Sequence, residues 1–165
     1  MSRAFVKEDA QGPDEDPPER PLSDLPNYCT PRGLALYQAE EAKLLAALAG
    51  YEGAQEDPLK KKRKRELERD LRWVRARLEA AIPVDPAKQP KDEVRFGASV
   101  SLVDGDGKTR RLRIVGEDEA TEDGENLSWA SPFAQAMFGL KAGQGFERTF
   151  EDKIERWTIA KLEYD

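Results

Sequence analysis

Histidine is absent from the 165-residue sequence, and cysteine occurs once, at Cys29. These absences exclude Ser-His-Asp and Cys-His catalytic arrangements, disulfides within the chain, and the ordinary His- and Cys-based zinc sites. A bound metal ion would need the carboxylate oxygens of Asp and Glu. Charged side chains are therefore the first candidates for function.

Long apolar stretches are also missing. No run approaches the roughly 20 apolar residues of a membrane-spanning helix, and the N-terminal residues MSRAFVKEDAQ lack the apolar core of a signal peptide. Charged residues make up 36% of the sequence and the net charge is −6, while the mean hydropathy is −0.78. The sequence predicts a soluble, cytoplasmic protein without a membrane partner, with room for one medium or two small domains.

Residues 1–27 are rich in proline and in acidic residues. They contain five of the eleven prolines and seven acidic residues against three basic ones. Large apolar side chains are too few here to offset the entropy of ordering the chain. The composition predicts a disordered acidic arm.

Two helical patterns follow the arm. Thr30 and Pro31 suit the cap and first position of a helix that the apolar spacing extends to Ala49. The second pattern has apolar residues in alternating steps of four and three at Leu67, Leu71, Val74, Leu78 and Ala81. Because charged residues cover the other faces, we expect an antiparallel coiled-coil hairpin over residues 28–82. The proline-rich residues 83–91 are expected to form a linker.

The period of the apolar residues changes to two after the linker, which indicates strands with one buried face. Strands are expected over residues 94–102, 109–115, 145–150 and 156–164. The residues DGDG (104–107) predict a hairpin turn, and Ser131-Pro132 suits the start of a short helix. Residues 92–165 therefore predict a small α+β domain with an antiparallel sheet and one short helix.

Two groups of charged residues are candidates for chemistry. Acidic residues that could chelate Mg²⁺ lie between the two predicted helices, at Glu52, Glu56 and Asp57. The alternative is that these acids only keep the loop solvated. A basic patch of six cations follows at Lys60, Lys61, Lys62, Arg63, Lys64 and Arg65. Such a run can bind RNA, DNA or an acidic protein surface, or it can be a solvated helix start.

Three stretches stand in a recognisable order. They are VRFGASVSLVDGDGKTRRLRIVGEDEA (94–120), WASPFAQAMFGLKAGQGFE (129–147) and LEYD (162–165). They resemble the C-terminal domain of the bacterial transcript-cleavage factors GreA and GreB, whose patterns are close to V-x-F-G-A-x-V, I-V-G-x-D-E-A, S-P-I/M-A-R-A-L and V/I-E-Y. Thr30-Pro31-Arg32-Gly33 is similar to the family's helix-opening T-x-x-G. The resemblance covers about residues 28–165.

The resemblance implies a transcription elongation regulator rather than an enzyme, with a coiled coil followed by an FKBP-like domain. In that family the C-terminal domain docks on RNA polymerase at the rim of the secondary channel. The coiled coil enters the channel near the nascent RNA and DNA, where acidic tip residues share a Mg²⁺ ion with the polymerase active site. No cofactor of the protein's own is implied.

The resemblance also implies site residues. Glu56 and Asp57 would be the tip acids. The polymerase-docking surface would lie at Ser131, Pro132, Phe133, Ala134 and Met137, with Ile114, Gly116, Asp118 and Glu119 near it.

The sequence departs from the family pattern at the tip. Residues 49–62 (AGYEGAQEDPLKKK) lack the family's G-D-x-x-E-N-A, and the hairpin looks about 14 residues shorter, which removes about 10 Å of reach at 1.5 Å per residue. In the docking helix, Gln135 and Ala130 stand where the family often has Arg and Asp or Asn. Two mechanisms stay open: donation of carboxylates to the metal, and occupancy of the channel, as expected for shortened relatives such as the regulator of nucleoside diphosphate kinase.

Two other functions are alternatives. An FKBP-like fold suggests a peptidyl-prolyl isomerase with an aromatic pocket, although most aromatic residues are needed to fill so small a core. A basic coiled-coil adaptor would bind RNA or DNA through Lys60–Arg65 alone, which a pI near 5.0 disfavours. The hairpin satisfies its own apolar seam, so a monomer is expected.

Overall fold

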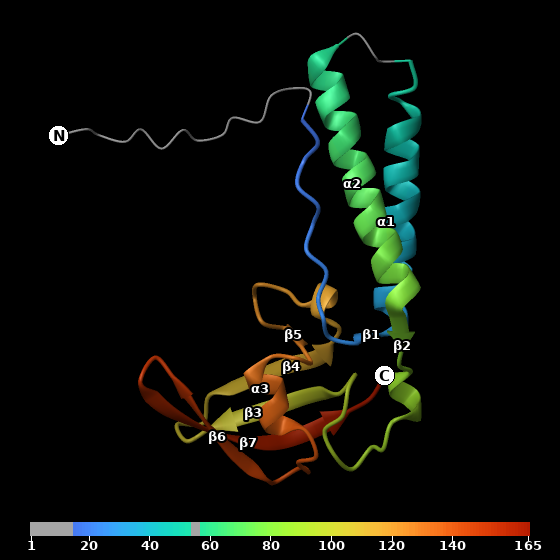
Figure 1. Cartoon of the computed structure of the whole chain (residues 1–165). Helices are drawn as coiled ribbons and strands as arrows, with labels where there is room; N and C mark the ends of the chain where they lie inside the picture. Colours follow the sequence, from blue (N-terminus) through green and yellow to red (C-terminus); the bar gives the residue numbers. More distant parts are fainter. Residues whose placement is uncertain (1–14, 54–56) are drawn as a thin grey trace, which may run out of the picture. The chain divides into compact units, whose positions relative to one another are not determined.

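The structure is a computed structural model that describes residues 15–53 and 57–165. The chain divides into a helical unit, which includes Tyr37–Glu79 and residues up to Asp24, and a sheet unit, which includes Leu25–Leu36 and Ala80–Asp165 (Figure 1). The first long helix, α1 (Pro31–Ala49), begins in the sheet unit and continues in the helical unit. Its bounds are those that the sequence predicts.

The helical unit packs α1 against α2 (Pro58–Ala80) along a narrow apolar seam. Leu44 of α1 and Leu67, Leu71 and Val74 of α2 are buried in this seam. The predicted steps of four and three therefore mark the buried face of α2. Asp57 caps α2, because its side chain accepts a hydrogen bond from the Leu59 backbone N–H at 3.0 Å.

Residues 15–24 lie along α2 in the helical unit (Figure 1). Glu19 is hydrogen-bonded to Arg72, and the Trp73 indole N–H donates to the Pro21 carbonyl. The structure therefore gives this part contacts that the prediction of a disordered arm does not include, whereas residues 1–14 lie outside the described residues. Composition misses the contact because the partner side chains stand more than fifty positions later in the chain.

The sheet unit contains a five-stranded sheet in the order β5-β4-β3-β7-β6. Its strands are β3 (Ser99–Asp104), β4 (Thr109–Val115), β5 (Asn126–Ser128), β6 (Gly145–Phe150) and β7 (Lys153–Glu163). Pairing is antiparallel except between β4 and β5, which makes the sheet mixed. Two short parallel strands, β1 (Asn27–Cys29) and β2 (Ala81–Pro83), flank the long helices in sequence. The predicted α+β fold is confirmed.

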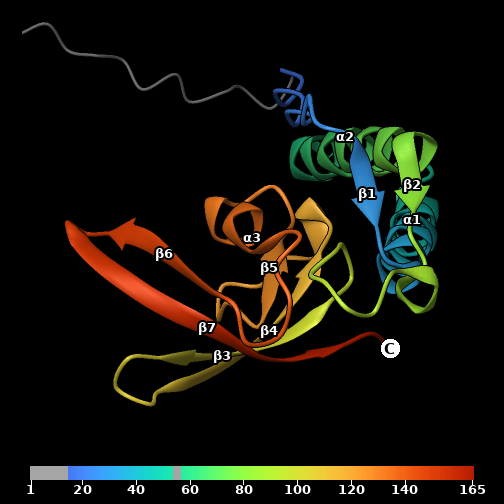
Figure 2. The ribbon, with the colours of Figure 1, turned by 90° about the horizontal axis from the view of Figure 1, so that it is seen from below.

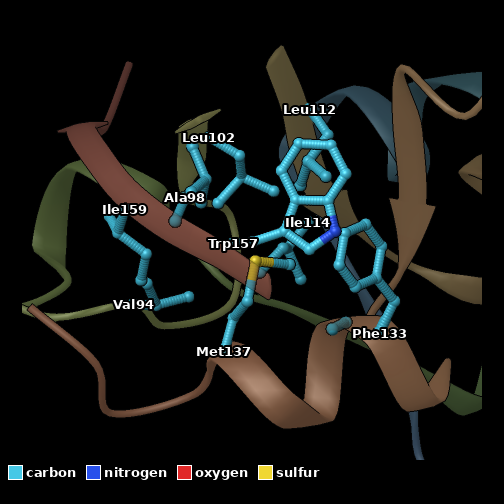
Figure 3. Packing of buried hydrophobic residues seen from close by; sticks show 11 residues of the cluster. Val94, Ala98, Leu102, Leu112, Ile114, Phe133, Met137, Trp157 and Ile159 are labelled. Carbon is cyan, nitrogen blue, oxygen red and sulfur yellow. The ribbon is translucent and has the colours of Figure 1, made fainter. Parts of the chain in front are cut away.

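The core of the sheet unit lies between the sheet and the short helix α3 (Pro132–Met137), which covers one face of the sheet (Figure 2). Phe133 and Met137 point from α3 toward Leu112, Ile114 and Trp157 of the strands (Figure 3). The alternation predicted for residues 94–102 is present as burial, since Val94, Ala98, Val100 and Leu102 are fully enclosed.

The first predicted strand of this unit is shorter than expected. Residues 94–98 form a turn before β3, with the Ala98 N–H bonded to the Arg95 carbonyl. Gly97 adopts a φ of 86° and lies against Pro86, where a Cβ would come within 2.9 Å of the proline ring. Pro86 itself belongs to a 3₁₀ turn, η1 (Pro86–Lys88), inside the predicted linker. The described helices include none that is long and apolar enough to cross a membrane.

Candidate functional site

Helix α3 and its N-cap hold five of the nine residues implied in polymerase docking. Ser131 is its N-cap and accepts a hydrogen bond from the Ala134 N–H at 3.2 Å, and Pro132 occupies the first turn. Phe133 is 5% exposed, and Ala134 and Met137 are not exposed at all. These three side chains fill the core of the sheet unit, so they present little or no surface to a partner, and their part in docking stays a prediction. Pro132, Gln135 and Ala136 are the exposed residues of the helix.

Two arginines flank the ring of Phe133. The guanidinium carbon of Arg148 lies 4.1 Å from the Phe133 ring centre, and that of Arg110 lies 5.0 Å from it. Arg148 also lies 4.9 Å from the ring of Phe150, a half-exposed residue at the end of β6. The hydrogen bond from Arg148 lowers the pKa of Glu155 below its ordinary value of 4.5. This charged and aromatic cluster adjoins α3 and was not predicted.

The other residues implied in docking lie at the end of β4 and in the short turn η2 (Glu117–Glu119): Ile114 in β4, Gly116 just before the turn, and Asp118 and Glu119 within it. The Glu119 carboxylate accepts hydrogen bonds from the backbone N–H groups of Thr30 and Gly116, each at 3.0 Å, and from the Thr30 hydroxyl. Thr30 in turn caps α1, because its Oγ1 accepts from the Gly33 N–H at 3.1 Å. Glu119 therefore fixes the first turn of α1 to the sheet unit.

The two glycines at this junction are required by close approach. A Cβ at Gly33 would overlap the Glu119 carboxylate, and a Cβ at Gly116 would stand 2.5 Å from the Tyr28 carbonyl oxygen. Gly116 is buried and Glu119 has a structural role. Their assignment to the docking surface stays a prediction. The T-x-x-G and G-E-D-E-A motifs thus meet in space.

Asp118 is the exposed acid of η2. It lines a hollow of about 250 Å³ together with Arg32, Arg113, Thr121 and Asn126. Within the sheet unit, Asp118 is therefore accessible to a partner, unlike Gly116 and the core residue Ile114.

The predicted tip acids are only partly described. Glu56 lies outside the described residues. Asp57 accepts from the Leu59 N–H at 3.0 Å and from the Lys60 N–H at 3.5 Å, so its carboxylate is used as the cap of α2. Residues 15–53 and 57–165 contain no group of three acidic or Cys side chains placed to hold a metal ion.

The basic patch forms the first two turns of α2. Arg63 pairs with Glu66 at 3.1 Å, Lys64 with Glu68 at 3.8 Å, and Arg65 with Asp16 at 3.4 Å. These pairs reduce the repulsion that like charges at i, i+4 produce on a helix. Lys60 and Lys62 are exposed, so the patch is open to an anionic partner.

Two groups of contacts in the sheet unit were not predicted from the sequence. The Thr30–Glu119 link joins residues 89 positions apart, and its only sequence signal is the pairing of T-x-x-G with a later acid after glycine. The arginines around Phe133 come from β4 and β6, and nothing in the local pattern singles them out.

A family model described as "Transcription elongation factor, GreA/GreB, C-term" matches residues 89–164. The transcription elongation factor GreB of Neisseria meningitidis serogroup A is 37% identical over 105 residues, which cover 63% of this chain and 64% of the relative. GreA of Phenylobacterium zucineum is 31% identical over 105 residues, covering 63% of this chain and 67% of the relative. The chain thus spans a little under two thirds of the GreB relative.

A solved structure titled as a transcription elongation factor GreA/GreB from Nitrosomonas europaea is 20% identical, with a TM-score of 0.43. The match covers 84% of this chain and 99% of that one.

Proposed function

Because this chain belongs to the GreA/GreB family of transcription elongation factors, we propose that it regulates elongation by binding RNA polymerase at the secondary channel. The sheet unit docks at the channel rim, and the helical hairpin enters the channel and modulates backtracking and transcript cleavage. The protein has no catalytic centre of its own, so any cleavage is carried out by the polymerase.

Within this proposal, the hairpin acts by occupying the channel. The observation that carries this choice is the bonding of Asp57, whose carboxylate caps α2 through two backbone N–H groups. A carboxylate used in this way has fewer lone pairs left for a Mg²⁺ ion, which prefers near-ideal octahedral oxygen coordination. The tip also lacks the acidic motif of the cleavage factors, as noted above.

Docking uses the exposed face of α3 and the neighbouring turn. Pro132, Gln135 and Ala136 are exposed on α3, and Asp118 is exposed on η2. Gln135 is held in place, since its side-chain amide donates to the Trp129 carbonyl at 2.7 Å. This hydrogen bond restricts the Gln135 side chain before binding, which lowers the entropic cost of association.

The mechanism is tested on a stalled, backtracked polymerase complex by measuring the rate of RNA 3′-end cleavage with Mg²⁺ and saturating protein. Occupancy predicts no stimulation, together with dose-dependent loss of the stimulation that a GreA or GreB factor produces. Stimulation that disappears in the Glu56→Gln/Asp57→Asn variant would establish carboxylate donation instead. Asn retains the N-cap, so this variant removes charge without removing the cap.

Docking is tested with Ala136→Glu, which places a charge on the exposed face of α3. We expect it to abolish competition with the GreA or GreB factor. Ala160→Glu is the matched control, because Ala160 is exposed on β7. Equal competition by both variants and by the unmodified chain would place docking elsewhere.

A further inference from the structure

The residues from Asp16 to Pro21 form an extended segment that lies on α2, outside any helix or strand. Asp16 pairs with Arg65 at 3.4 Å, and the Nε and Nη2 groups of Arg72 each donate to a carboxylate oxygen of Glu19. Arg20 pairs with Asp70 at 3.7 Å. Each of the three charged side chains of the segment thus pairs with an opposite charge on α2.

The spacing of charged residues along the segment and along α2 explains why their charges pair. A polyproline II segment has three residues per turn and rises about 3.1 Å per residue, so Asp16 and Glu19 fall on one side, about 9 Å apart. Arg65 and Arg72 are two helical turns apart on one face of α2, about 10.5 Å at 1.5 Å per residue. Pro17 and Pro18 favour the polyproline II form and reduce the entropy lost when the segment lies down.

Trp73 completes the contact. Its indole N–H donates to the Pro21 carbonyl at 3.1 Å, and the Arg20 guanidinium lies 3.8 Å from the ring centre. A planar cationic group therefore stacks on an aromatic ring that stands beside arginines of the same helix. A nucleic acid base would occupy the same position over such a ring.

We propose that residues 15–21 are a built-in cover over a single-stranded RNA-binding face of α2, and that RNA must displace this cover to bind. On this face, Arg65 and Arg72 would bind phosphates and Trp73 would stack on a base. The basic patch Lys60–Arg65 extends the face toward the N-terminal end of α2. Asp16 and Glu19 stand where phosphates would lie, and Arg20 stands where a base would stack.

The cover can be displaced because its ion pairs are exposed. Exposed pairs contribute little net free energy and weaken with salt. The cover competes with RNA because it belongs to the same chain as α2, which holds its acidic residues near the helix at an effective concentration on the order of millimolar. RNA with several adjacent phosphates and bases can therefore compete, whereas a single free phosphate cannot. The hydrogen bond from Arg72 lowers the pKa of Glu19 from its ordinary value of 4.5, which agrees with the ion pair in the structure.

The test uses the full chain and a fluorescein-labelled 12-nucleotide oligouridylate RNA, with binding followed by fluorescence anisotropy at low salt and without polymerase. We expect Asp16→Asn/Glu19→Gln to bind RNA about tenfold more tightly than the unmodified chain, because two exposed ion pairs no longer oppose binding. The slope of log affinity against log salt should steepen by about 1.4, corresponding to two additional phosphate contacts on a single strand.

The matched control is Glu15→Gln/Asp24→Asn. It changes the net charge equally, at positions of the described segment for which no ion pair with α2 is present. An equal gain in both double variants would reduce the effect to net charge and overturn the proposal. No gain in either variant, or binding of polyglutamate but not of RNA, would overturn it as well.

A second measurement follows the cover itself. With 5-fluorotryptophan incorporated, the ¹⁹F signal of position 73 is identified by its loss in Trp73→Phe. Saturating RNA should move this signal in the unmodified chain to the position that it has in RNA-bound Asp16→Asn/Glu19→Gln. An unmoved signal while RNA binds would show that the cover stays in place. Because no polymerase is present, failure here leaves the channel proposal untouched.

Discussion

The sheet unit and the helical unit are stabilised in different ways. Among the described residues, the sheet core encloses eleven side chains, whereas the helical seam encloses four. The surface of α2 is instead lined by ion pairs such as Glu19–Arg72, in which both side chains are exposed, and Arg75–Glu41, in which Glu41 is partly buried. Burial constrains residue identity much more strongly than exposed pairs do.

The two units also differ in how they depart from the family pattern. The family model describes the C-terminal part alone and matches residues 89–164, which lie within the sheet unit. There the departures are single residues, Ala130 and Gln135, whereas the helical unit has a tip without the family motif and an acidic segment lying on α2. A region that is stabilised by many weak surface ion pairs can change its sequence while it keeps its fold.

Ile114→Ala should produce the largest effect, because Ile114 is fully buried in the sheet core. Removing its side chain loses transfer free energy and leaves a cavity, so the free energy of unfolding should fall by about 2–5 kcal/mol. Urea denaturation measures this change. Ile154→Ala is the control of the same residue type, since Ile154 is 65% exposed, and should stay within about 0.5 kcal/mol. Similar losses in both would contradict the packing in Figure 3.

Gly33→Ala tests the junction at the start of α1. The new methyl group displaces the Glu119 carboxylate from Thr30 and Gly116, which should cost about 1–3 kcal/mol of unfolding free energy. In a Glu119→Ala background the same substitution should be neutral or stabilising, because Ala favours helix over Gly. Gly105→Ala, which meets only open space, should have little effect. Additive effects of Gly33→Ala and Glu119→Ala would refute the contact.

Asp57→Ala probes the helical unit with a smaller change. Loss of the cap of α2 should lower its stability by about 1 kcal/mol, while Asp57→Asn should retain most of it. Circular dichroism at 222 nm during urea titration measures both. A full loss with Asn would mean that the charge, rather than the hydrogen bonds at the cap, stabilises the helix.

Glu155 should give the smallest effect, through pH. Its pKa is lowered from 4.5 by the hydrogen bond from Arg148, so the folded state binds this proton less readily than the unfolded state does. The contribution is therefore present above pH 4.5 and is lost as pH falls through the lower folded pKa. A ¹³C-detected NMR titration of the carboxyl should show a midpoint below 4.5 that returns toward the ordinary value in Arg148→Gln. An unchanged midpoint in that variant would assign the shift to another group.

Local signals predicted much of the fold. Thr30 and Pro31 mark the start of α1, Gly50 marks its end, and the turn DGDG separates β3 from β4. These signals could be read from the sequence because each depends on the backbone preferences of adjacent residues. The turn at Gly97 was missed because it packs against Pro86, which stands eleven positions earlier in the chain. The order of residues 15–21 was missed for the same reason.

The candidate site was less predictable from the sequence. Phe133 and Met137 belong to a recognisable motif, yet a motif does not reveal which of its residues face inward. Only the packing of α3 on the sheet separates Pro132, which a partner can contact, from Phe133, which it cannot.

The Thr30–Glu119 junction also limits how this gene could exchange parts with its relatives. A recombination breakpoint between residues 33 and 116 would separate the glycine from the acid whose position it accommodates. A chimera that takes a longer hairpin from a relative therefore needs a donor with a compatible threonine and glycine at the helix start. The length and the tip of the hairpin can change without affecting this contact. Residues 30–33, in contrast, must stay compatible with Glu119 of the sheet unit.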